Sequence, residues 1–249
     1  MYFDFAEVQK FYQSDLGQRV RFYLGEEVYN QFSDLQNSHV LGFGFTQPFL
    51  SLMEGVPKSM ASLSPARMGV APWEGDKGNR SAMASGKHLP LKDGSYERVL
   101  LVHALEFSRN PSVLLRELWR VLAPGGELIA VVPARTGLWS HAESTPFGHG
   151  EPLSSKQLKK LLTNQLFEIE ASKGALHFPP TKLFSFDASF ATMEKVGRVV
   201  WPGLAGVNLV KARKKLFEGE GGQKEHVRRP LAEPVANFKG LEAPKIKGQ

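Results

Sequence analysis

The sequence predicts a doubly wound α/β fold, with a mostly parallel sheet of the seven-strand type and helices on both faces. Residues 89–133 contain two apolar strands separated by an amphipathic helix. The apolar run Val99–Val102 is continuous, as in strands that are buried on both faces of a parallel sheet. Apolar segments alternate with helical ones on either side of this block, which is typical of βα units.

The composition favours one globular domain. A chain of 249 residues suits a single α/β domain with modest additions, and a hydrophobic content of 42% allows a substantial core. The absence of cysteine excludes disulfides and thiolate metal sites. The N-terminus lacks the order of a signal peptide, and no apolar run reaches the ~20 residues of a membrane helix. We therefore expect a cytoplasmic protein with no membrane partner.

The charge is basic, with a formal net charge of +6 and a pI of about 9.4. Nucleic acid or an acidic ligand could exploit such a balance. The basic residues are scattered, however, and are not interleaved with aromatic residues in a stripe. The pattern favours a solubilising surface and makes nucleic acid an unexpected partner.

The N-terminal half contains a helical segment and two βα units. Residues 4–33 have apolar residues at helical spacing, and Ser14 can cap a helix. The next elements expected are a strand from His39 to Leu41, a helix over 46–53 and a strand over 58–63. The glycine-rich and charged segment 67–80 predicts an exposed excursion, and a short third strand over 81–85 follows it.

The C-terminal half begins with the most regular block. Arg98–His103 is the fourth strand, and Asn110-Pro111 opens a helix that Pro124-Gly125-Gly126 ends. The remaining elements expected are a strand over 127–132, a helix from Ser154, strands over 167–173 and 207–214, and a helix over 186–199. These elements make a domain of residues 1–217, with residues 1–37 as its N-terminal helical segment, and leave a polar tail, 218–249, that we expect to be flexible.

Short motifs in the central block sit at a characteristic spacing. They are Leu89-Pro90-Leu91, Asp93, Ser95-Tyr96-Glu97, Leu105-Glu106 and Leu122-Ala123-Pro124-Gly125-Gly126. In these motifs the chain resembles the class I S-adenosylmethionine-dependent methyltransferases, in particular the group that includes the ubiquinone-biosynthesis C-methyltransferases. The resemblance extends over residues 38–170. It implies that the strands over 167–173 and 207–214 form the antiparallel edge typical of this family. It also implies that S-adenosylmethionine is bound outside the carboxyl ends of the strands.

The resemblance places the first cofactor contact in the turn after the first strand. Gly42, Phe43, Gly44 and Phe45 occupy the positions of the family's glycine-rich motif, and Gly44 matches its first glycine. Gly42 stands where the family has an acidic residue, and the motif's two later glycines are replaced. A tight turn that only joins a strand to a helix is the alternative interpretation.

Two further cofactor contacts are implied by the resemblance. Ser62-Leu63 stands where the family has an acidic residue that binds the ribose, and Ser85 stands where it has an aspartate near the adenine amino group. The adjoining Gly86, Lys87 and His88 complete the expected cofactor-binding set. A hydrogen bond to a charged group is worth roughly 1.5–3 kcal/mol, so the lost carboxylates predict weakened binding or its loss.

Two histidines are candidates for chemistry on the methyl acceptor. His103 ends the fourth strand, where a general base with a pKa suited to neutral pH could act. His149 lies in the loop 145–150, which could be a lid that points this side chain into the cleft. A packing histidine and a simple turn are the alternatives. The histidines lack metal-ligand spacing, so we expect no metal site.

Three functions are compatible with these observations. The first is an S-adenosylmethionine-dependent methyltransferase that acts on an unidentified small molecule. The second is a non-catalytic partner or regulatory protein with the same fold, which has lost cofactor binding. The third, an RNA-binding or RNA-modifying protein, rests on charge alone. The oligomeric state is left open by the sequence.

Overall fold

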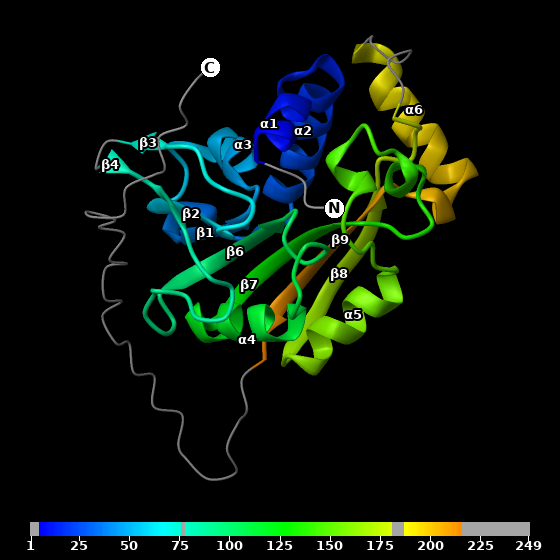
Figure 1. Ribbon diagram of the computed structural model, residues 1–249. Helices are drawn as coiled ribbons and strands as arrows, with labels where there is room; N and C mark the ends of the chain where they lie inside the picture. Colours follow the sequence, from blue (N-terminus) through cyan, green and yellow to red (C-terminus); the bar gives the residue numbers. More distant parts are fainter. Residues whose placement is uncertain (1–4, 76–77, 181–186, 216–249) are drawn as a thin grey trace.

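The computed structural model describes residues 5–75, 78–180 and 187–215. Seven strands form one sheet in the order β5-β2-β1-β6-β7-β9-β8 (Figure 1). The strands are β1 (His39–Gly44), β2 (Ser59–Ser64), β5 (Ser81–Met83), β6 (Tyr96–Val102), β7 (Leu122–Pro133), β8 (Phe167–Ala175) and β9 (Val207–Lys214). Strand β9 is antiparallel to β7 and to β8, and the other neighbours are parallel. The predicted mostly parallel sheet with an antiparallel edge is confirmed.

Helices cover both faces of this sheet. They are α1 (Phe5–Gln13), α2 (Asp15–Tyr29), α3 (Gln47–Leu50), α4 (Pro111–Val121), α5 (Ser155–Asn164) and α6 (Asp187–Val200). Helices α1, α2 and α3 pack on one face, and α4 and α5 pack on the other. Helix α6 lies beside α2, where the Tyr23 hydroxyl donates a hydrogen bond to Glu194. The excursion predicted over 67–80 carries a small hairpin of β3 (Glu74–Gly75) and β4 (Gly78–Asn79).

The N-terminal segment predicted as helical contains two helices. Ser14 separates them, and its hydroxyl accepts a hydrogen bond from the Gly17 backbone N–H at 3.2 Å, which caps α2 as expected. A Cβ on Gly17 would lie 1.8 Å from the Phe11 carbonyl oxygen. Only glycine therefore allows α2 to start so close to the end of α1. This close approach lets α1 turn back toward the carboxyl edge of the sheet.

The sheet separates two buried apolar clusters, one on each face. Alternate residues of β6 serve the two clusters: Leu100 and Val102 pack toward α1 and α2, whereas Val99 and Leu101 pack toward α4 and α5. All four side chains are buried. The continuous apolar run of this strand thus reflects burial on both faces, as the sequence predicted.

The boundary between α4 and β7 differs from the prediction. Helix α4 ends at Val121 and β7 begins directly at Leu122, before the glycine turn, because Leu122 pairs with Tyr96. The pairing register then shifts, and regular pairing resumes at Glu127, opposite Arg98. Gly125 takes a left-handed φ of +69° within this shift. The tail predicted over 218–249 lies outside the described residues and stays a prediction.

Candidate functional site

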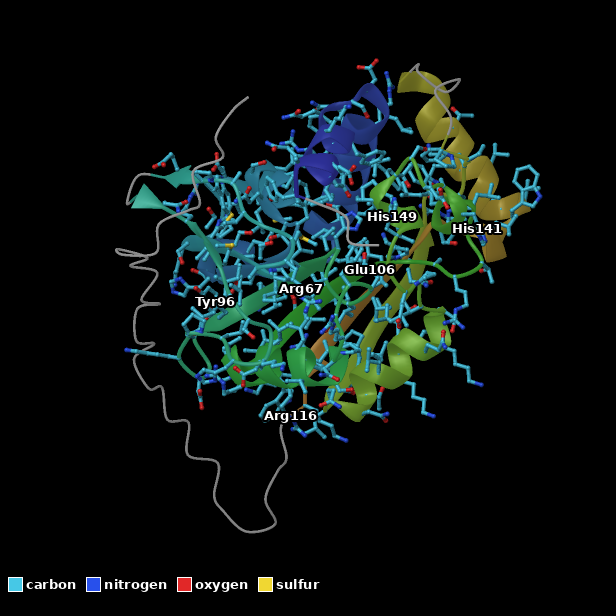
Figure 2. All side chains as sticks on the ribbon, in the orientation of Figure 1. Arg67, Tyr96, Glu106, Arg116, His141 and His149 are labelled. Atoms are coloured by element: carbon cyan, nitrogen blue, oxygen red, sulfur yellow. The ribbon has the colours of Figure 1, made fainter. Side chains whose placement is uncertain are left out.

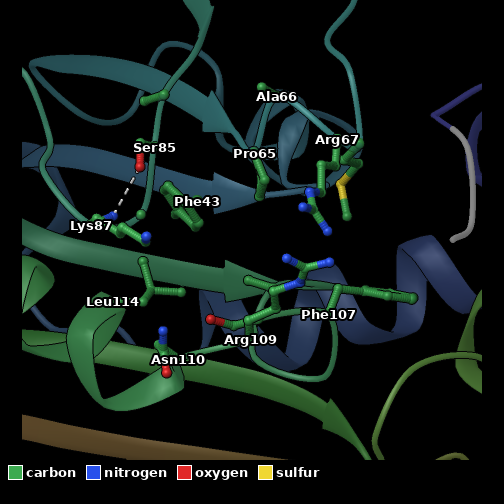
Figure 3. Close-up of a pocket in the computed structure, with 15 residues that line it drawn as sticks. Phe43, Pro65, Ala66, Arg67, Ser85, Lys87, Phe107, Arg109, Asn110 and Leu114 are labelled. Carbon is green, nitrogen blue, oxygen red and sulfur yellow. Dashed lines mark hydrogen bonds between the residues drawn. The ribbon is translucent and has the colours of Figure 1, made fainter.

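A cavity of about 340 Å³ opens at the carboxyl ends of four parallel strands. Strand β1 lies between β2 and β6, so the chain crosses to opposite sides of β1 in its two halves. This is the topological switch point, where doubly wound sheets bind ligands. The residues that line the cavity are Phe43, Pro65, Ala66, Arg67, Met68, Ala84, Ser85, Gly86, Lys87, Ala104, Phe107, Ser108, Arg109, Asn110 and Leu114 (Figure 3).

The inner part of the cavity is an apolar slot. Its walls are Phe43 from β1, Ala84 after β5 and Leu114 from α4. A Cβ on Gly86 would lie 3.1 Å from Leu114 Cδ1 and 3.4 Å from the Phe43 ring. The missing side chain of Gly86 thus keeps the space between Phe43 and Leu114 open. A flat apolar group fits such a slot.

The glycines of the turn after β1 allow close packing of the chain around them. Gly44 has a φ of +101°, and a Cβ there would lie 2.1 Å from the Val102 carbonyl oxygen. Only glycine lets β1 approach β6 this closely, and the Phe45 N–H then donates to the same carbonyl at 2.8 Å. A Cβ on Gly42 would lie 2.0 Å from the Thr46 hydroxyl. Of the four residues predicted in this turn, Phe43 lines the cavity, and Gly42, Gly44 and Phe45 do not.

The end of β2 places the predicted ribose contact away from the cavity. The Ser62 side chain is buried, and its hydroxyl lies 2.9 Å from that of Thr46. Leu63 is buried in the apolar cluster under α4. The cavity wall is formed instead by the following loop, from Pro65 to Met68. The Ser62 hydroxyl is therefore engaged by Thr46 and does not line the cavity.

The loop after β5 matches the prediction in part. Ser85, Gly86 and Lys87 line the cavity, and the Lys87 N–H donates to the Ser85 hydroxyl at 3.3 Å. His88 is exposed and lies outside the cavity wall, with Nδ1 3.7 Å from a carboxylate oxygen of Glu117. Hydrogen bonds from Arg120 lower the pKa of this carboxyl group, which keeps it ionised.

Two arginines that the sequence analysis did not single out line the outer part of the cavity. Arg67 follows β2 and Arg109 follows β6, so each lies in a loop at a carboxyl end of the sheet. With Lys87 they make three basic side chains, and none of the described residues that line the cavity is acidic. The rule that ligands bind at this edge of the sheet could have indicated both arginines. Whether the two arginine side chains point into the cavity depends on the conformation of their loops, and the periodicity of apolar residues does not predict loop conformation.

His103 lies at the end of β6 in a buried cluster. It has a left-handed φ of +51°, and its Nε2 lies 2.8 Å from the Tyr12 hydroxyl of α1. Its Nδ1 lies 3.1 Å from a carboxylate oxygen of Glu106. Burial, and then the charge of Glu106, raise the pKa of Tyr12 well above its ordinary value. Tyr12 therefore stays protonated. Because a carboxylate only accepts, Nδ1 of His103 donates a hydrogen bond to Glu106, and Nε2 of the neutral ring then accepts one from the Tyr12 hydroxyl.

This arrangement joins α1 to the sheet. Both ring nitrogens of His103 are engaged by protein groups, and the side chain is 1% exposed. The ring also packs against Phe147, with ring centroids 4.9 Å apart. A role for His103 as general base would require Tyr12 to move away from Nε2. His103 and Glu106 lie outside the cavity wall.

The loop predicted as a lid covers the end of β6, but through a different residue. The Glu151 N–H donates to the Glu106 carbonyl at 2.8 Å, which ties the end of the loop to the residues after β6. Phe147 is buried against His103. His149 is half-buried, and its Nε2 lies 2.8 Å from the Glu143 carbonyl oxygen within the same loop. The structure thus places the Phe147 ring against His103, whereas His149 bonds within the loop.

Within residues 5–75, 78–180 and 187–215, no three histidine or acidic side chains are grouped in a way that could hold a metal ion. None of the helices that the structure describes is long and apolar enough to span a membrane.

Comparison with known proteins gives a consistent result. Residues 42–130 match the family model of the methyltransferase domain. The chain is 28% identical over 149 residues to an uncharacterized protein of Mycobacterium tuberculosis, an alignment that covers 55% of this chain and 52% of that protein. It is 29% identical over 128 residues to norajmaline N-methyltransferase of Rauvolfia serpentina, covering 49% of this chain and 42% of the enzyme. The chain thus spans about half the length of the curated relatives it matches.

A solved structure agrees with this match at the level of the fold. The S-adenosylmethionine-dependent methyltransferase of Thermotoga maritima, described as a possible histamine N-methyltransferase, superposes with a TM-score of 0.59 at 17% identity. The superposition covers 84% of this chain and 95% of that one. The strand order and the cavity at the switch point agree with these matches: the chain has the fold of the S-adenosylmethionine-dependent methyltransferases, and its residues 42–130 are similar to the methyltransferase domain.

Proposed function

We propose that this protein is an S-adenosylmethionine-dependent methyltransferase that acts on a small-molecule acceptor. S-Adenosylmethionine is the cofactor of the family. The observation that carries the proposal is the apolar slot between Phe43 and Leu114, which Gly86 keeps open at the switch point of the sheet. A volume of about 340 Å³ lies within the range of roughly 300–1,000 Å³ that is typical of ligand pockets.

The residues of the cavity fit the adenine ring of this cofactor better than its ribose hydroxyls. The slot offers apolar contact for the adenine ring, and Ser85 and Lys87 at its edge offer polar groups. Among the described lining residues, no carboxylate is present to accept hydrogen bonds from the ribose. When bound, the cofactor supplies an electrophilic methyl group, so the protein has to position the acceptor and exclude water. Weak binding is therefore expected.

The aromatic cluster beside the cavity suits the exclusion of water. Tyr12 stacks on Phe45 with ring centroids 5.4 Å apart, and Phe147 packs on His103. These rings cover the carboxyl ends of β1 and β6, next to the cavity. We infer that a small acceptor reaches this region only when α1 or the loop 145–150 moves. Such gating is common in enzymes that must keep a reactive group from water.

The proposal is tested by calorimetric titration of S-adenosylhomocysteine into the wild-type chain and the variant Gly86→Val. We expect weak, saturable binding to the wild type and a large loss of affinity in the variant, because the new side chain enters the slot. Gly203→Val is the control, because a Cβ at Gly203 meets no atom within 4 Å. Equal affinity of the wild type and Gly86→Val would contradict the assignment of the slot.

A second candidate function is a non-catalytic partner with the same fold. The observation that favours it is the side chain of Ser62, which is engaged by Thr46 at the position where the family has its ribose-binding acid. This candidate predicts no saturable heat at millimolar S-adenosylhomocysteine and no thermal shift.

A further inference from the structure

The outer part of the cavity carries charge of one sign. Arg67, Lys87 and Arg109 line it, and no acidic side chain does so among the described residues. Arg67 comes from the loop after β2 and Arg109 from the loop after β6, so the two arginines approach from opposite sides of β1. In Figure 3 their guanidinium groups point toward one another across the opening.

Helix α4 adds to this positive potential. Asn110, which lines the cavity, is the residue that precedes the first turn of α4, and its carbonyl accepts hydrogen bonds from the N–H groups of Val113 and Leu114. The N-terminal end of an α-helix bears a partial positive charge. The helix therefore directs its positive end at the same space as the two arginines.

We propose that the cavity binds a nucleoside phosphate, with the base in the slot between Phe43 and Leu114 and the phosphate between Arg67 and Arg109. Guanidinium groups match phosphate oxygens with paired, charge-assisted hydrogen bonds, and a flat base suits an apolar slot. A nucleotide contains a flat base and a phosphate, and the cavity contains an apolar slot and a group of basic side chains. This proposal rests on the proposed function, because it uses the same slot between Phe43 and Leu114 for the base. The phosphate position between Arg67 and Arg109 is new.

This assignment sets an order of affinities. S-Adenosylmethionine carries a net positive charge, S-adenosylhomocysteine is neutral overall and adenosine diphosphate is an anion. Three basic side chains favour the anion and disfavour the cation. A nucleotide therefore competes with the cofactor for the slot, and binds more tightly than either S-adenosyl compound at low ionic strength.

The test is calorimetric titration of adenosine, adenosine diphosphate, S-adenosylhomocysteine and pyrophosphate into three forms of the full chain. These are the wild type, the double variant Arg67→Gln/Arg109→Gln, and the control Arg116→Gln. Arg116 is exposed on α4 and lies outside the cavity wall (Figure 2). In the wild type we expect the diphosphate to bind roughly tenfold more tightly than adenosine, or better, and pyrophosphate to bind more weakly than the diphosphate. The double variant loses this advantage and keeps its affinity for adenosine, whereas Arg116→Gln keeps both.

Four results would overturn the inference: equal affinity for adenosine and its diphosphate, an advantage that survives the double substitution, the same loss in Arg116→Gln, or pyrophosphate binding as tight as that of the diphosphate. If S-adenosylhomocysteine binds and the diphosphate does not, the proposed function stands and only this inference fails. If none of the adenosyl ligands binds, the base slot is wrong and both proposals fail.

Discussion

Gly44 and Gly78 have the same φ in different surroundings. Both hold φ at +101°, but a Cβ on Gly44 would meet the Val102 carbonyl oxygen at 2.1 Å, and one on Gly78 would meet nothing within 4 Å. Substitutions at the two positions therefore separate two costs in folding free energy: that of a left-handed backbone, present at both, and that of steric overlap, present only at Gly44. It shows that Gly44 is needed to join β1 to β6, whatever its relation to a ligand.

We expect Gly44→Ala to lower the free energy of unfolding by ~2–4 kcal/mol, and Gly78→Ala by ~1 kcal/mol. The smaller figure is the cost of the left-handed backbone, and the larger one adds overpacking against β6. Urea denaturation of the two variants measures both values. Equal losses would show that β1 can move away from β6 at little cost.

Tyr96 makes stability fall at high pH. Its hydroxyl is buried without a hydrogen-bond partner in the described structure, and burial raises its pKa to about 12, from an ordinary value near 10. Above pH 10 the unfolded chain loses this proton while the folded chain retains it, so stability falls with rising pH up to about pH 12. The slope for one such group is ~1.4 kcal/mol per pH unit.

Tyr96→Phe removes this contribution. We expect the variant to equal or exceed the wild type in stability at pH 8, because no hydrogen bond is lost, and to lose stability less steeply between pH 10 and pH 12. Burial also raises the pKa values of Tyr12 and Tyr23, so some alkaline slope remains. Chemical denaturation at pH 8, 10 and 11 measures the difference, and parallel curves for the two proteins would refute the assignment.

The cavity residues could be predicted from the sequence only in part. Phe43, Ser85, Gly86 and Lys87 were expected at a binding site, and all line the cavity. Ser62 was expected there as well, but it lies within β2, two residues before the end of the strand, and its hydroxyl contacts that of Thr46. Matching a motif gives the position along a strand. The face on which the side chain emerges, and the path of the loop beyond it, depend on packing with other segments.

At the scale of elements, the loop after β7 joins two parts of the molecule through one ring. Phe147 contacts Phe11 of α1, Trp139 of the loop itself and His103 after β6. His149, two residues on, bonds back to Glu143 within the loop. The aromatic side chain therefore holds the loop on the sheet, and the hydrogen bond of His149 to Glu143 stabilises the turn.

Substitution of the two residues separates these roles. We expect Phe147→Ala to cost ~3–5 kcal/mol of folding free energy, because a fully buried ring is replaced by a cavity. His149→Ala is expected to cost less, about 1 kcal/mol, since its hydrogen bond to the Glu143 carbonyl lies at a half-buried site. Thermal and urea unfolding compare them. A loss in His149→Ala as large as that in Phe147→Ala would show that the histidine holds the loop.

The long, periodic elements were predictable and their junctions were not. Strand β6 has a continuous apolar run because it is buried on both faces. Helix α4 has apolar residues at helical spacing because it is buried on one face. The break between α1 and α2 has a local signal in Ser14, but the sharp return of the chain depends on Gly17 meeting Phe11. Likewise, β7 begins before the expected residue 127 because Leu122 pairs with Tyr96, which lies in a distant segment of the chain.

At the scale of the whole molecule, the sheet order brings together loops that are far apart in the sequence. The cavity takes residues from the loops after β2, β5 and β6, and these loops meet only because β1 lies between β2 and β6. The resemblance to the methyltransferase family supplied this order, including the antiparallel edge strand β9. Local patterns alone predict the strands and leave their order open.

The boundary of the domain is a prediction at this scale. Residues 218–249 lack apolar periodicity and are rich in glycine, proline and charge, so we expect them to contribute little to the core. Deletion of this tail is expected to leave the melting temperature within a few degrees of that of the full chain. A large decrease on deletion, measured by calorimetry, would show that the tail is part of the folded unit.

The most direct test of the central claim is a crystal structure of the chain with S-adenosylhomocysteine at a saturating concentration. We expect the adenine ring to lie between Phe43 and Leu114, in contact with Gly86, at the carboxyl ends of β1 and β5. A ligand bound elsewhere on the molecule, or a slot that stays empty while calorimetry shows saturation, would contradict this expectation.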